Sequence, residues 1–511
     1  MSEVVLDGGA LSPVEVRAVS RGDTTVRLGN TARERMEAAR AVVERALEND
    51  EVVYGVTTGF GALANTRISA ERAAAMQHAL LRSHAAGVGD PLPRDLVRAL
   101  LLLRARTLAQ GHSGIRIEVV ERYLDFLAAD LLPVVPDRGS VGASGDLAPF
   151  AHLALPVIGE GLLDDGNGPR PASEVLEGHG LEPLVLEAKD GLSLLNGTEG
   201  MLAIGVLASG GAWELARAAD IACAMSVEAL LGSVRPFGEA VNALRPHPGQ
   251  GEVAGNLRRL LEGSAIVASH HHDFEHAVQD AYSLRCAPQV HGAARDTFRH
   301  ADDVFAIELR SVVDNPIVFP ETGEVISAGN FHGQPLAFAL DFMTVALTEL
   351  GSMSERRTDR ILDPERSAGL PPFLATEPGV DSGFMLAQYT AAALVAENRV
   401  LSHPASVESI PTSGSQEDHV SMGWGAGRKT REVLDSTLRV IAVELLCAAE
   451  GIRHRDQEPA PATAAALEVL TSVAPPLDGD RPVGPDIEAV AALISDGSLT
   501  RAVEAVTGTL A

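Results

Sequence analysis

The amino-acid sequence predicts a mainly α-helical protein built around a bundle of long helices. Aromatic residues make up only 4% of the chain, while alanine and leucine abound. This composition favours helices packed through small aliphatic side chains over a sandwich of strands. Two stretches, 198–234 and 336–362, run without an internal proline. About thirty helical residues would reach roughly 45 Å, so helices of this length normally form bundles.

Short β-prone pieces precede the first helix. EVVLDG and TTVRLG lie within the first 30 residues, and helical periodicity then begins with TARERMEAARAVVERALEND. Three further helical stretches lie between residues 69 and 132: ERAAAMQHALLRSHAAG, RDLVRALLLLRARTLAQG and IEVVERYLDFLAADLL. The Gly-, Pro- and Asp-rich passage 159–183 predicts a surface hairpin or loop.

The second half of the chain alternates helical and irregular segments. The periodicity predicts helices over 290–312, 385–401, 427–453 and 485–511. The proline-rich passage 459–482 is expected to be irregular apart from a short helical piece at ATAAALEVL.

The balance of charge argues against two classes of partner. The chain has 41 lysines and arginines against 69 acidic residues, which gives a formal net charge of −28 at pH 7. Such a chain repels nucleic-acid phosphates and anionic lipid surfaces, so we expect neither nucleic acid nor a membrane as a partner. The most apolar segment, 201–213, is interrupted by three glycines and falls short of a membrane span.

Cysteine usage and the N-terminus indicate the compartment. Cys223, Cys286 and Cys447 are too few and too far apart for a disulfide scaffold, and they suit a reducing environment. The N-terminal MSEVVLDGG lacks the basic region and apolar core of a secretory signal. We therefore expect a cytoplasmic protein.

The tripeptide Ala143-Ser144-Gly145 can form an electrophile that no ordinary side chain supplies. If the backbone nitrogen of Gly145 attacks the carbonyl carbon of Ala143 and two waters leave, a five-membered imidazolinone closes, with an exocyclic methylene from Ser144. Gly145 suits this attack because it has no Cβ to crowd the closure. An isolated Ala-Ser-Gly is usually an ordinary loop. Here Gly142 precedes it, and helical periodicity resumes after Asp146, which predicts a tight connection before a helix.

With six other blocks, this segment resembles the MIO-dependent aromatic amino acid ammonia-lyases, in which MIO is the 4-methylidene-imidazol-5-one ring just described. The blocks stand in the family's order and span most of the first 420 residues, so coincidence does not account for them. They are YGVTTGFG (54–61), SHAAG (83–87), GSVGASGDLAP (139–149), LLNGTEG (194–200), QDAYSLRCAPQ (279–289), GNFHGQP (329–335) and QEDHVSMG (416–423).

The resemblance implies a fold, a cofactor and an assembly. The fold is a long-helix bundle with a smaller N-terminal part that carries the MIO loop. The whole chain, 1–511, would form one ammonia-lyase catalytic unit, with an N-terminal part over about 1–200, a central bundle over about 201–480 and C-terminal helices over about 481–511. The MIO would form autocatalytically without an external cofactor. The assembly would be a homotetramer with shared active sites.

Elimination of ammonia from an amino acid also requires a base, because the β-proton is hardly acidic. Tyr54 lies in a glycine-flanked segment that predicts a mobile loop. Tyrosine normally titrates near about 10, so it acts as a base only when its pKa is lowered. The resemblance assigns Tyr54 as the catalytic base on a lid over the site. Whether Tyr54 or Tyr282 is the main base stays open.

A second group of candidates follows a spacing of three residues. Gln279, Tyr282 and Arg285 would share a face about 120° wide if their segment were helical. The planar fork of donors on Arg285 suits a carboxylate. By resemblance, Arg285 binds the substrate carboxylate, while Gln279 and Tyr282 line the MIO pocket.

Asn196 and Phe331 complete the pocket that the resemblance implies. The amide of Asn196 can donate and accept near the MIO oxygen or the substrate amino group, although Asn-Gly is also a common turn dipeptide. Phe331 matches an aromatic residue that packs beside the electrophile, and core packing is its alternative role.

Two ionisable residues indicate which aromatic ring is accepted. His84 and Glu417 suit an imidazole, whose two nitrogens need hydrogen bonds. A phenyl ring would leave both groups unpaired, at a cost of roughly 1–3 kcal/mol each. Relatives that act on phenylalanine usually carry an apolar residue and Gln at these positions. Glu417 also precedes a predicted helix start after SGS, so a capping role is its alternative.

The expected reaction is therefore elimination of ammonia from L-histidine to give trans-urocanate, the first step of histidine degradation. A tyrosine or other aromatic amino acid ammonia-lyase and an MIO-dependent aminomutase are the nearest alternatives. A helical scaffold that keeps the fold without the activity is the alternative from another class. Small departures from the family pattern, Ala281 for Pro and His291 for an apolar residue, bear on pocket shape only.

We expect no metal centre. The run SHHHDFEH (269–276) is rich in histidine, but adjacent histidines point in different directions and no second cluster of ligands accompanies it. The sequence also has no phosphate loop, dinucleotide fingerprint or GxSxG elbow.

Overall fold

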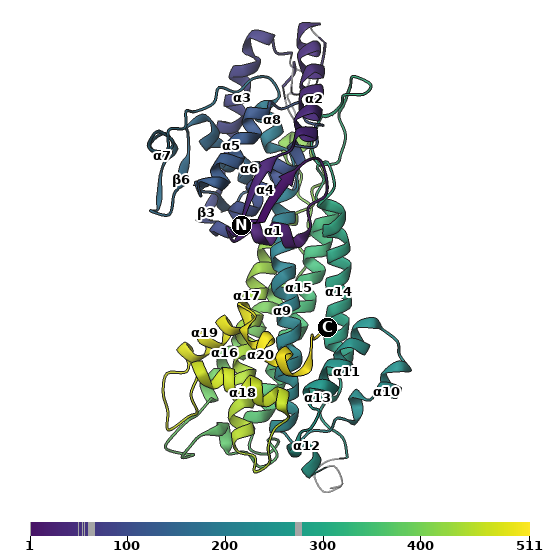
Figure 1. Ribbon diagram of the computed structural model, residues 1–511, viewed down its shortest axis with the longest axis vertical. Helices are drawn as coiled ribbons and strands as arrows, with labels where there is room; N and C mark the ends of the chain where they lie inside the picture. The colour runs from purple at the N-terminus through teal and green to yellow at the C-terminus, as the bar shows by residue number, and fades with distance from the viewer. Residues whose placement is uncertain (1, 50, 54, 56, 60–66, 271–277) are drawn as a thin grey trace. The chain divides into compact units, whose positions relative to one another are not determined.

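The protein is mainly helical in the computed structural model, which describes residues 2–49, 51–53, 55, 57–59, 67–270 and 278–511 (Figure 1). The chain forms two compact units. Unit 1 comprises Met1–Leu207, Asp302–Leu340 and Pro404–Arg428, and unit 2 comprises Ala208–Ala301, Asp341–His403 and Lys429–Ala511. Each unit is therefore assembled from three separate stretches of sequence.

The N-terminus of unit 1 is a small parallel β-pair with a helix between its strands. Strand β1 (Ser2–Leu6) pairs with β2 (Thr24–Leu28), in agreement with the two predicted β-prone pieces. Helix α1 (Pro13–Ser20) connects them and begins with a capping box, in which the Ser12 hydroxyl and the Glu15 carboxylate satisfy each other's backbone N–H groups.

Four helices of unit 1 follow the predicted order. They are α2 (Asn30–Glu48), α3 (Ala70–His84), α4 (Arg94–Leu108) and α5 (Ile117–Ala128). Every residue of α4 from Leu96 to Leu108 is buried, so this helix lies in the core of unit 1. Three of those buried residues are arginines, Arg98, Arg104 and Arg106, and each requires buried partners.

Short strands and helices carry the connections of unit 1. The predicted hairpin in 159–183 is confirmed as β6 and β7, which extend β4 into an antiparallel sheet. The β3–β5 and β8–β9 pairs were not predicted. The bounds are β3 (Val88–Pro91), β4 (Leu132–Pro133), β5 (Pro136–Arg138), α6 (Leu147–Ala154), η2 (Leu155–Ile158), β6 (Leu162–Asp164), β7 (Pro169–Pro171), α7 (Ala172–Gly178), α8 (Asp190–Leu195), β8 (Ile317–Phe319), β9 (Glu324–Ile326) and η5 (Ser413–Ser415).

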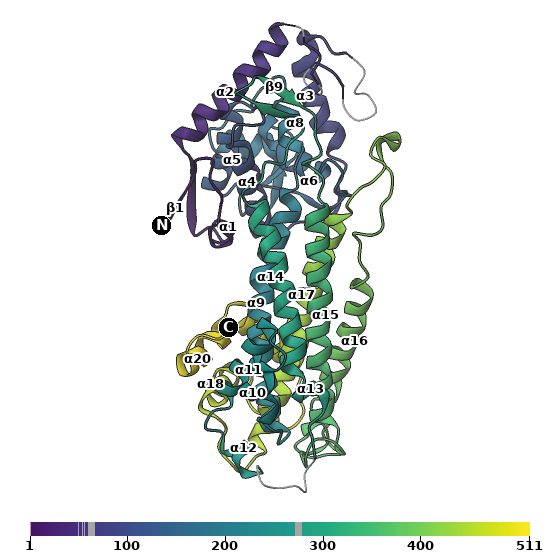
Figure 2. The same cartoon turned by 90° about the vertical axis from the view of Figure 1, so that its right-hand side faces the viewer.

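The long-helix prediction is confirmed. The four long helices are α9 (Glu199–Ala229), α14 (Ala287–Glu308), α15 (Gln334–Leu362) and α17 (Gly423–Arg453). Their stretches within unit 2 lie side by side as a bundle (Figure 2). Helix α15 is long and apolar enough to cross a membrane, but 72% of its most apolar window is buried within the protein, as is usual for a core helix.

Shorter helices complete unit 2. The predicted helix over 485–511 breaks into α19 and α20 at Gly497, whose left-handed φ of 75° ends the helical geometry. The predicted piece at ATAAALEVL is longer than expected, as α18. The bounds are η3 (Arg235–Phe237), α10 (Glu239–Ala243), α11 (Pro248–Leu260), α12 (Ala265–Ser269), α13 (Tyr282–Arg285), η4 (Pro372–Leu374), α16 (Met385–Leu401), α18 (Pro461–Val473), α19 (Gly484–Ser495) and α20 (Ser498–Thr507).

Candidate functional site

The tripeptide 143–145 forms a tight turn immediately before α6, as the sequence predicts. Ser144 and Gly145 have left-handed φ angles of 50° and 79°. Gly145 forms a parallel bridge with Gly197, in which the Gly197 N–H donates to the Ser144 carbonyl at 3.3 Å and the Asp146 N–H donates to the Gly197 carbonyl at 2.8 Å. The turn is therefore attached through its backbone to the segment that carries Asn196.

Two glycines of this turn have no room for a side chain. A Cβ on Gly145 would stand 1.8 Å from the Gly197 carbonyl oxygen, and one on Gly142 would stand 2.0 Å from Ser421 Oγ. Real Cβ atoms essentially never approach so closely. Only glycine therefore fits at these two positions without displacing Gly197 or Ser421.

A buried carboxyl group lies directly behind the turn. Asp146 is fully buried; its Oδ1 accepts from Ser140 Oγ at 3.0 Å, and its Oδ2 accepts from the Met201 N–H at 2.9 Å. Burial, with a smaller repulsion from Glu199, raises the pKa of Asp146 to about 7. Asp146 was read from the sequence only as the residue that follows the tripeptide.

A buried ion pair lies against Gly197, the partner of Gly145 in the parallel bridge. Arg104 Nη1 donates to Glu199 Oε1 at 2.6 Å, and both side chains are almost completely buried. Arg104 also donates to the Ser193 carbonyl of α8. A Cβ on Gly197 would collide with both charged groups. No local sequence pattern indicates this pair, because its members lie 95 residues apart.

Asn196 lies beside the turn, in the connection that the Asn-Gly dipeptide predicts. It caps the end of α8, and with Gly197 it forms the connection to α9. Its side chain is buried, and Nδ2 donates to the Asn315 carbonyl at 2.9 Å. The amide orientation is thus set by a contact with a distant loop.

His84 and Glu417, the pair expected to recognise the substrate ring, both belong to unit 1 and interact through charge. His84 is the last residue of α3, and its Nδ1 lies 2.9 Å from the Leu80 carbonyl. Burial lowers the pKa of His84, while the hydrogen bond to Leu80 and the charge of Glu417 oppose that shift. Glu417 Oε2 accepts from the Thr412 hydroxyl at 2.7 Å.

The predicted helix start after SGS is wrong. Residues 413–415 form only a 3-10 turn, and Glu417 pairs back with Thr412 in an antiparallel bridge. Ser413 and Ser415 have left-handed φ angles, which cannot continue into a right-handed helix. Helix α17 begins six residues later, at Gly423, so the capping alternative for Glu417 is removed.

Phe331 belongs to a segment that approaches the turn through a shared neighbour. Ser421 Oγ donates to the Gly142 carbonyl at 3.4 Å. A Cβ on Gly333 would stand 3.1 Å from Ser421 Oγ. Phe331 itself is half-buried, two residues before Gly333. The segments around residues 142, 331 and 421 therefore converge in unit 1.

The remaining predicted residues lie elsewhere. Tyr54 falls outside the described residues. Gln279, Tyr282 and Arg285 belong to unit 2, where Arg285 donates to Gln279 Oε1 and its guanidinium carbon lies 4.6 Å from the Tyr282 ring centroid. Arg285 thus contacts both other side chains, but the helix covers only Tyr282–Arg285, so the helical face expected for all three does not include Gln279. Arg285 Nε is buried and has no hydrogen-bond partner.

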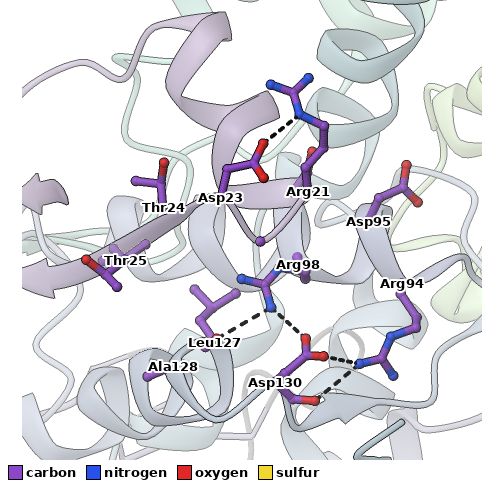
Figure 3. Close-up of a pocket in the computed structure, with 13 residues that line it drawn as sticks. Arg21, Asp23, Thr24, Thr25, Arg94, Asp95, Arg98, Leu127, Ala128 and Asp130 are labelled. Atoms are coloured by element: carbon purple, nitrogen blue, oxygen red, sulfur yellow. Dashed lines mark hydrogen bonds and ion pairs between the residues drawn. The ribbon is translucent and has the colours of Figure 1, made fainter. Parts of the chain in front are cut away.

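A cavity of about 880 Å³ in unit 1 contains none of the predicted residues (Figure 3). Its arginines already have partners: Arg98 and Arg94 contact Asp130 at 2.7 and 2.6 Å, and Arg21 contacts Asp23 at 3.0 Å. The positive charges of the cavity are thus neutralised by aspartates that also line it. Over the described part of the chain, no group of three potential metal ligands occurs.

A family model and several known proteins match this chain. The model for aromatic amino acid lyases matches residues 11–472. Histidine ammonia-lyase of Gloeobacter violaceus is 52% identical over 508 residues, which cover 99% of this chain and 98% of that protein. The histidine ammonia-lyase of Deinococcus radiodurans is also 52% identical, over 96% of this chain and 93% of that protein.

Solved structures agree with this family over the whole chain. A tyrosine aminomutase from Streptomyces globisporus superposes with a TM-score of 0.95 at 40% identity, covering 100% of both chains. Histidine ammonia-lyase from Trypanosoma cruzi superposes with a TM-score of 0.90 at 42% identity, covering 99% of this chain and 96% of that one.

Proposed function

This chain belongs to the aromatic amino acid lyase family, and from that premise we propose that it is a histidine ammonia-lyase, which converts L-histidine to trans-urocanate and ammonia. The observation that carries the proposal is identity at about half of all positions with histidine ammonia-lyases along nearly the whole chain. The residue types of His84 and Glu417, which interact through charge in unit 1, add a reason for the choice of substrate.

The residues of the turn suit formation of the MIO. The nitrogen of Gly145 would bond to the carbonyl carbon of Ala143, and two waters would leave, one of them carrying the Ser144 hydroxyl oxygen. The close fit of Gly145 against Gly197 supports this assignment, because a larger residue would displace the attacking nitrogen. When formed, the group supplies an electrophilic methylidene carbon that makes the substrate amine a better leaving group.

The other residues bind the substrate and move a proton. Arg285 holds the α-carboxylate, which suits the planar fork of donors on its guanidinium. Tyr54 removes the β-proton, with Tyr282 as the alternative base. Asn196 presents its amide beside the turn, and Gln279 and Phe331 line the pocket. His84 and Glu417 hydrogen-bond the two imidazole nitrogens, and the lowered pKa of His84 keeps its ring neutral at neutral pH.

The resemblance also carries a proposal for the assembly. The residues assigned to the pocket are divided between unit 1 and unit 2. A homotetramer with shared active sites, located in the cytoplasm, would supply all of them at each site. Light scattering of the purified protein measures the assembly directly.

An MIO-dependent aminomutase is the second candidate, favoured by the high similarity to a tyrosine aminomutase structure. Such an enzyme would move the amino group to the β-carbon and keep it in the product. Incubation with L-tyrosine, followed by chromatography for β-tyrosine and coumarate, separates this activity from ammonia release.

The deciding experiment follows the ultraviolet absorbance of urocanate after L-histidine is added. We expect turnover by the wild-type protein and none by Ser144→Ala. The intact mass of the wild type should be lower than the sequence mass by two waters, whereas the variant should retain its full sequence mass. A wild-type protein that has lost two waters but does not act on L-histidine would refute the substrate while keeping the reaction class.

A further inference from the structure

Helix α13 carries Tyr282 and Arg285 but cannot hold itself in place. It has only four residues, and a single helical turn is unstable in isolation because nucleation fixes several dihedral angles for one hydrogen bond. Tyr282 is 70% exposed, so packing of its ring contributes little to holding the helix. Contacts from other elements of unit 2 must therefore fix the helix.

Those contacts lie on its backbone and on its buried side. Arg357 Nη1, on α15, donates to the Ser283 carbonyl at 3.2 Å, between Tyr282 and Leu284. Leu284 is buried. Just before the helix, Asp280 Oδ2 accepts from the Ser233 N–H at 2.8 Å. Arg357 is thus a charged donor that hydrogen-bonds the backbone in the middle of α13.

A carboxylate holds the guanidinium of Arg357 in one orientation. Its Nε and Nη2 donate to the two oxygens of Glu444 on α17, the second at 2.8 Å, in a bidentate pair that is completely buried. Glu444 also accepts from Ser226 Oγ on α9 at 2.7 Å. Burial acts to lower the pKa of Arg357, but Glu444, Cys223 and Asp220 together outweigh it, so the pKa is raised and the cation is retained.

A neutral histidine orients the same guanidinium from the other side. His291 Nε2, on α14, lies 3.3 Å from Arg357 Nη1, and its Nδ1 lies 2.8 Å from Asp220 Oδ1. Since a guanidinium can only donate and an ionised carboxylate can only accept, the proton belongs on Nδ1 and Nε2 accepts. Burial lowers the pKa of His291, which agrees with this neutral form.

We infer that Arg357 is a positioning residue for α13, held by Glu444 and His291, and that it places Arg285 for the substrate carboxylate. This inference rests on the proposed function. Arg357 acts through the Ser283 carbonyl and the backbone of α13, two residues from Arg285. Four helices of unit 2 thus converge on one exposed turn through a buried polar network.

The primary test is Arg357→Lys, because lysine keeps a charge beside Glu444 but loses the planar fork that also reaches Ser283. We expect KM for L-histidine to rise about tenfold, with kcat within about threefold of wild type, since ground-state binding of the carboxylate is what weakens. The Ki of urocanate, which has a carboxylate, should rise in parallel. The Ki of histamine, which has none, should stay within about twofold of wild type.

Two further variants keep the test decisive if Arg357→Lys folds poorly. His291→Asn retains a donor toward Asp220 but loses the acceptor for Arg357, whereas His291→Gln retains an acceptor near the Nε2 position. We expect a clearly higher KM for the asparagine variant than for the glutamine variant. Equal KM values, or wild-type KM in both Arg357→Lys and His291→Asn, would overturn the inference.

A double variant distinguishes positioning from general damage. In the background of Arg285→Lys, adding Arg357→Lys should raise KM by no more than about twofold, since the residue through which it acts is already altered. Fully multiplicative effects would contradict the inference. The matched control is Arg455→Lys, another unit 2 arginine that donates to backbone carbonyls, at Ala229 and Ala368, and does not contact α13. Its KM should stay at the wild-type value.

Hydrogen exchange gives an answer that does not depend on the substrate. A peptide covering 279–290 should exchange faster in Arg357→Lys than in wild type, and not in Arg455→Lys. If the wild type does not turn over L-histidine, the proposed function fails, and exchange still decides the positioning role. Unchanged exchange in an active enzyme would refute the positioning role alone.

Discussion

The turn at residues 143–145 and the helix α13 are held in place by different physical means. Around the turn, glycines fit against backbone atoms, and a parallel bridge to Gly197 fixes the chain. At α13, a buried network of one neutral and three charged side chains from four long helices holds an exposed helical turn through the Ser283 carbonyl. The first arrangement admits almost no change of residue, whereas the second tolerates change at a cost in binding. We therefore expect substitutions in the turn to abolish turnover. Substitutions in the network that holds α13 should instead weaken substrate binding.

The largest effect is expected from Gly145→Ala, which places a methyl group 1.8 Å from the Gly197 carbonyl oxygen. The turn must open, so turnover should fall at least about a thousandfold and the mass should show no loss of water. Gly369→Ala is the matched control, with a similar φ of 83° and nothing within 4 Å of its Cβ. If Gly145→Ala loses two waters normally, the steric account of the turn is wrong.

The second effect concerns the network under α13. Glu444→Gln removes the charge that neutralises Arg357, and breaking a buried pair in this way costs about 3 kcal/mol or more. We expect a lower midpoint of urea unfolding, while intact mass still shows the loss of two waters. Failure of ring formation in a folded Glu444→Gln protein would show that the two regions are not independent.

The third prediction uses the raised pKa of Asp146, about 7 in the folded protein against an ordinary value of 3.8. Because the folded pKa is raised, the stability that the protonated group supplies is present at low pH and is lost as pH rises through about 7. Relative to Asp146→Asn, the wild type should therefore lose roughly 2–3 kcal/mol of unfolding free energy between pH 5 and pH 8. Denaturant titrations at each pH measure the difference, and parallel pH profiles would contradict the assignment.

The smallest loss of activity is expected from the hydrogen bond by which Thr412 orients Glu417 in unit 1. Thr412→Val removes the hydroxyl that donates to Glu417 Oε2 at 2.7 Å and keeps the shape of the side chain. Losing this hydrogen bond should lower kcat/KM for L-histidine about threefold to tenfold. Glu417→Gln should lower it further, because the charge itself is lost. A larger effect of Thr412→Val than of Glu417→Gln would contradict this order.

Much of the molecule follows from local sequence. The long proline-free stretches became α9 and α15, and the spacing around the tripeptide placed a turn before a helix. The break at Gly497 and the loop at 413–415 were missed, because helical periodicity continues across positions where the backbone turns left-handed. Short strands such as β3 and β8 were missed because pairing with a distant partner, and not their own composition, defines them.

The sequence by itself determined the tight turn at residues 143–145 and the residue types that suit an imidazole. Those requirements are local: a glycine with no Cβ, three small residues in a row, and two ionisable side chains within matching blocks. The tertiary structure alone decided which buried charges neutralise each other, as in the pairing of Arg104 with Glu199 and of Arg357 with Glu444. The physical reason is that burial and charge pairing depend on contacts between residues about 90 positions apart, and no local pattern in the chain records them.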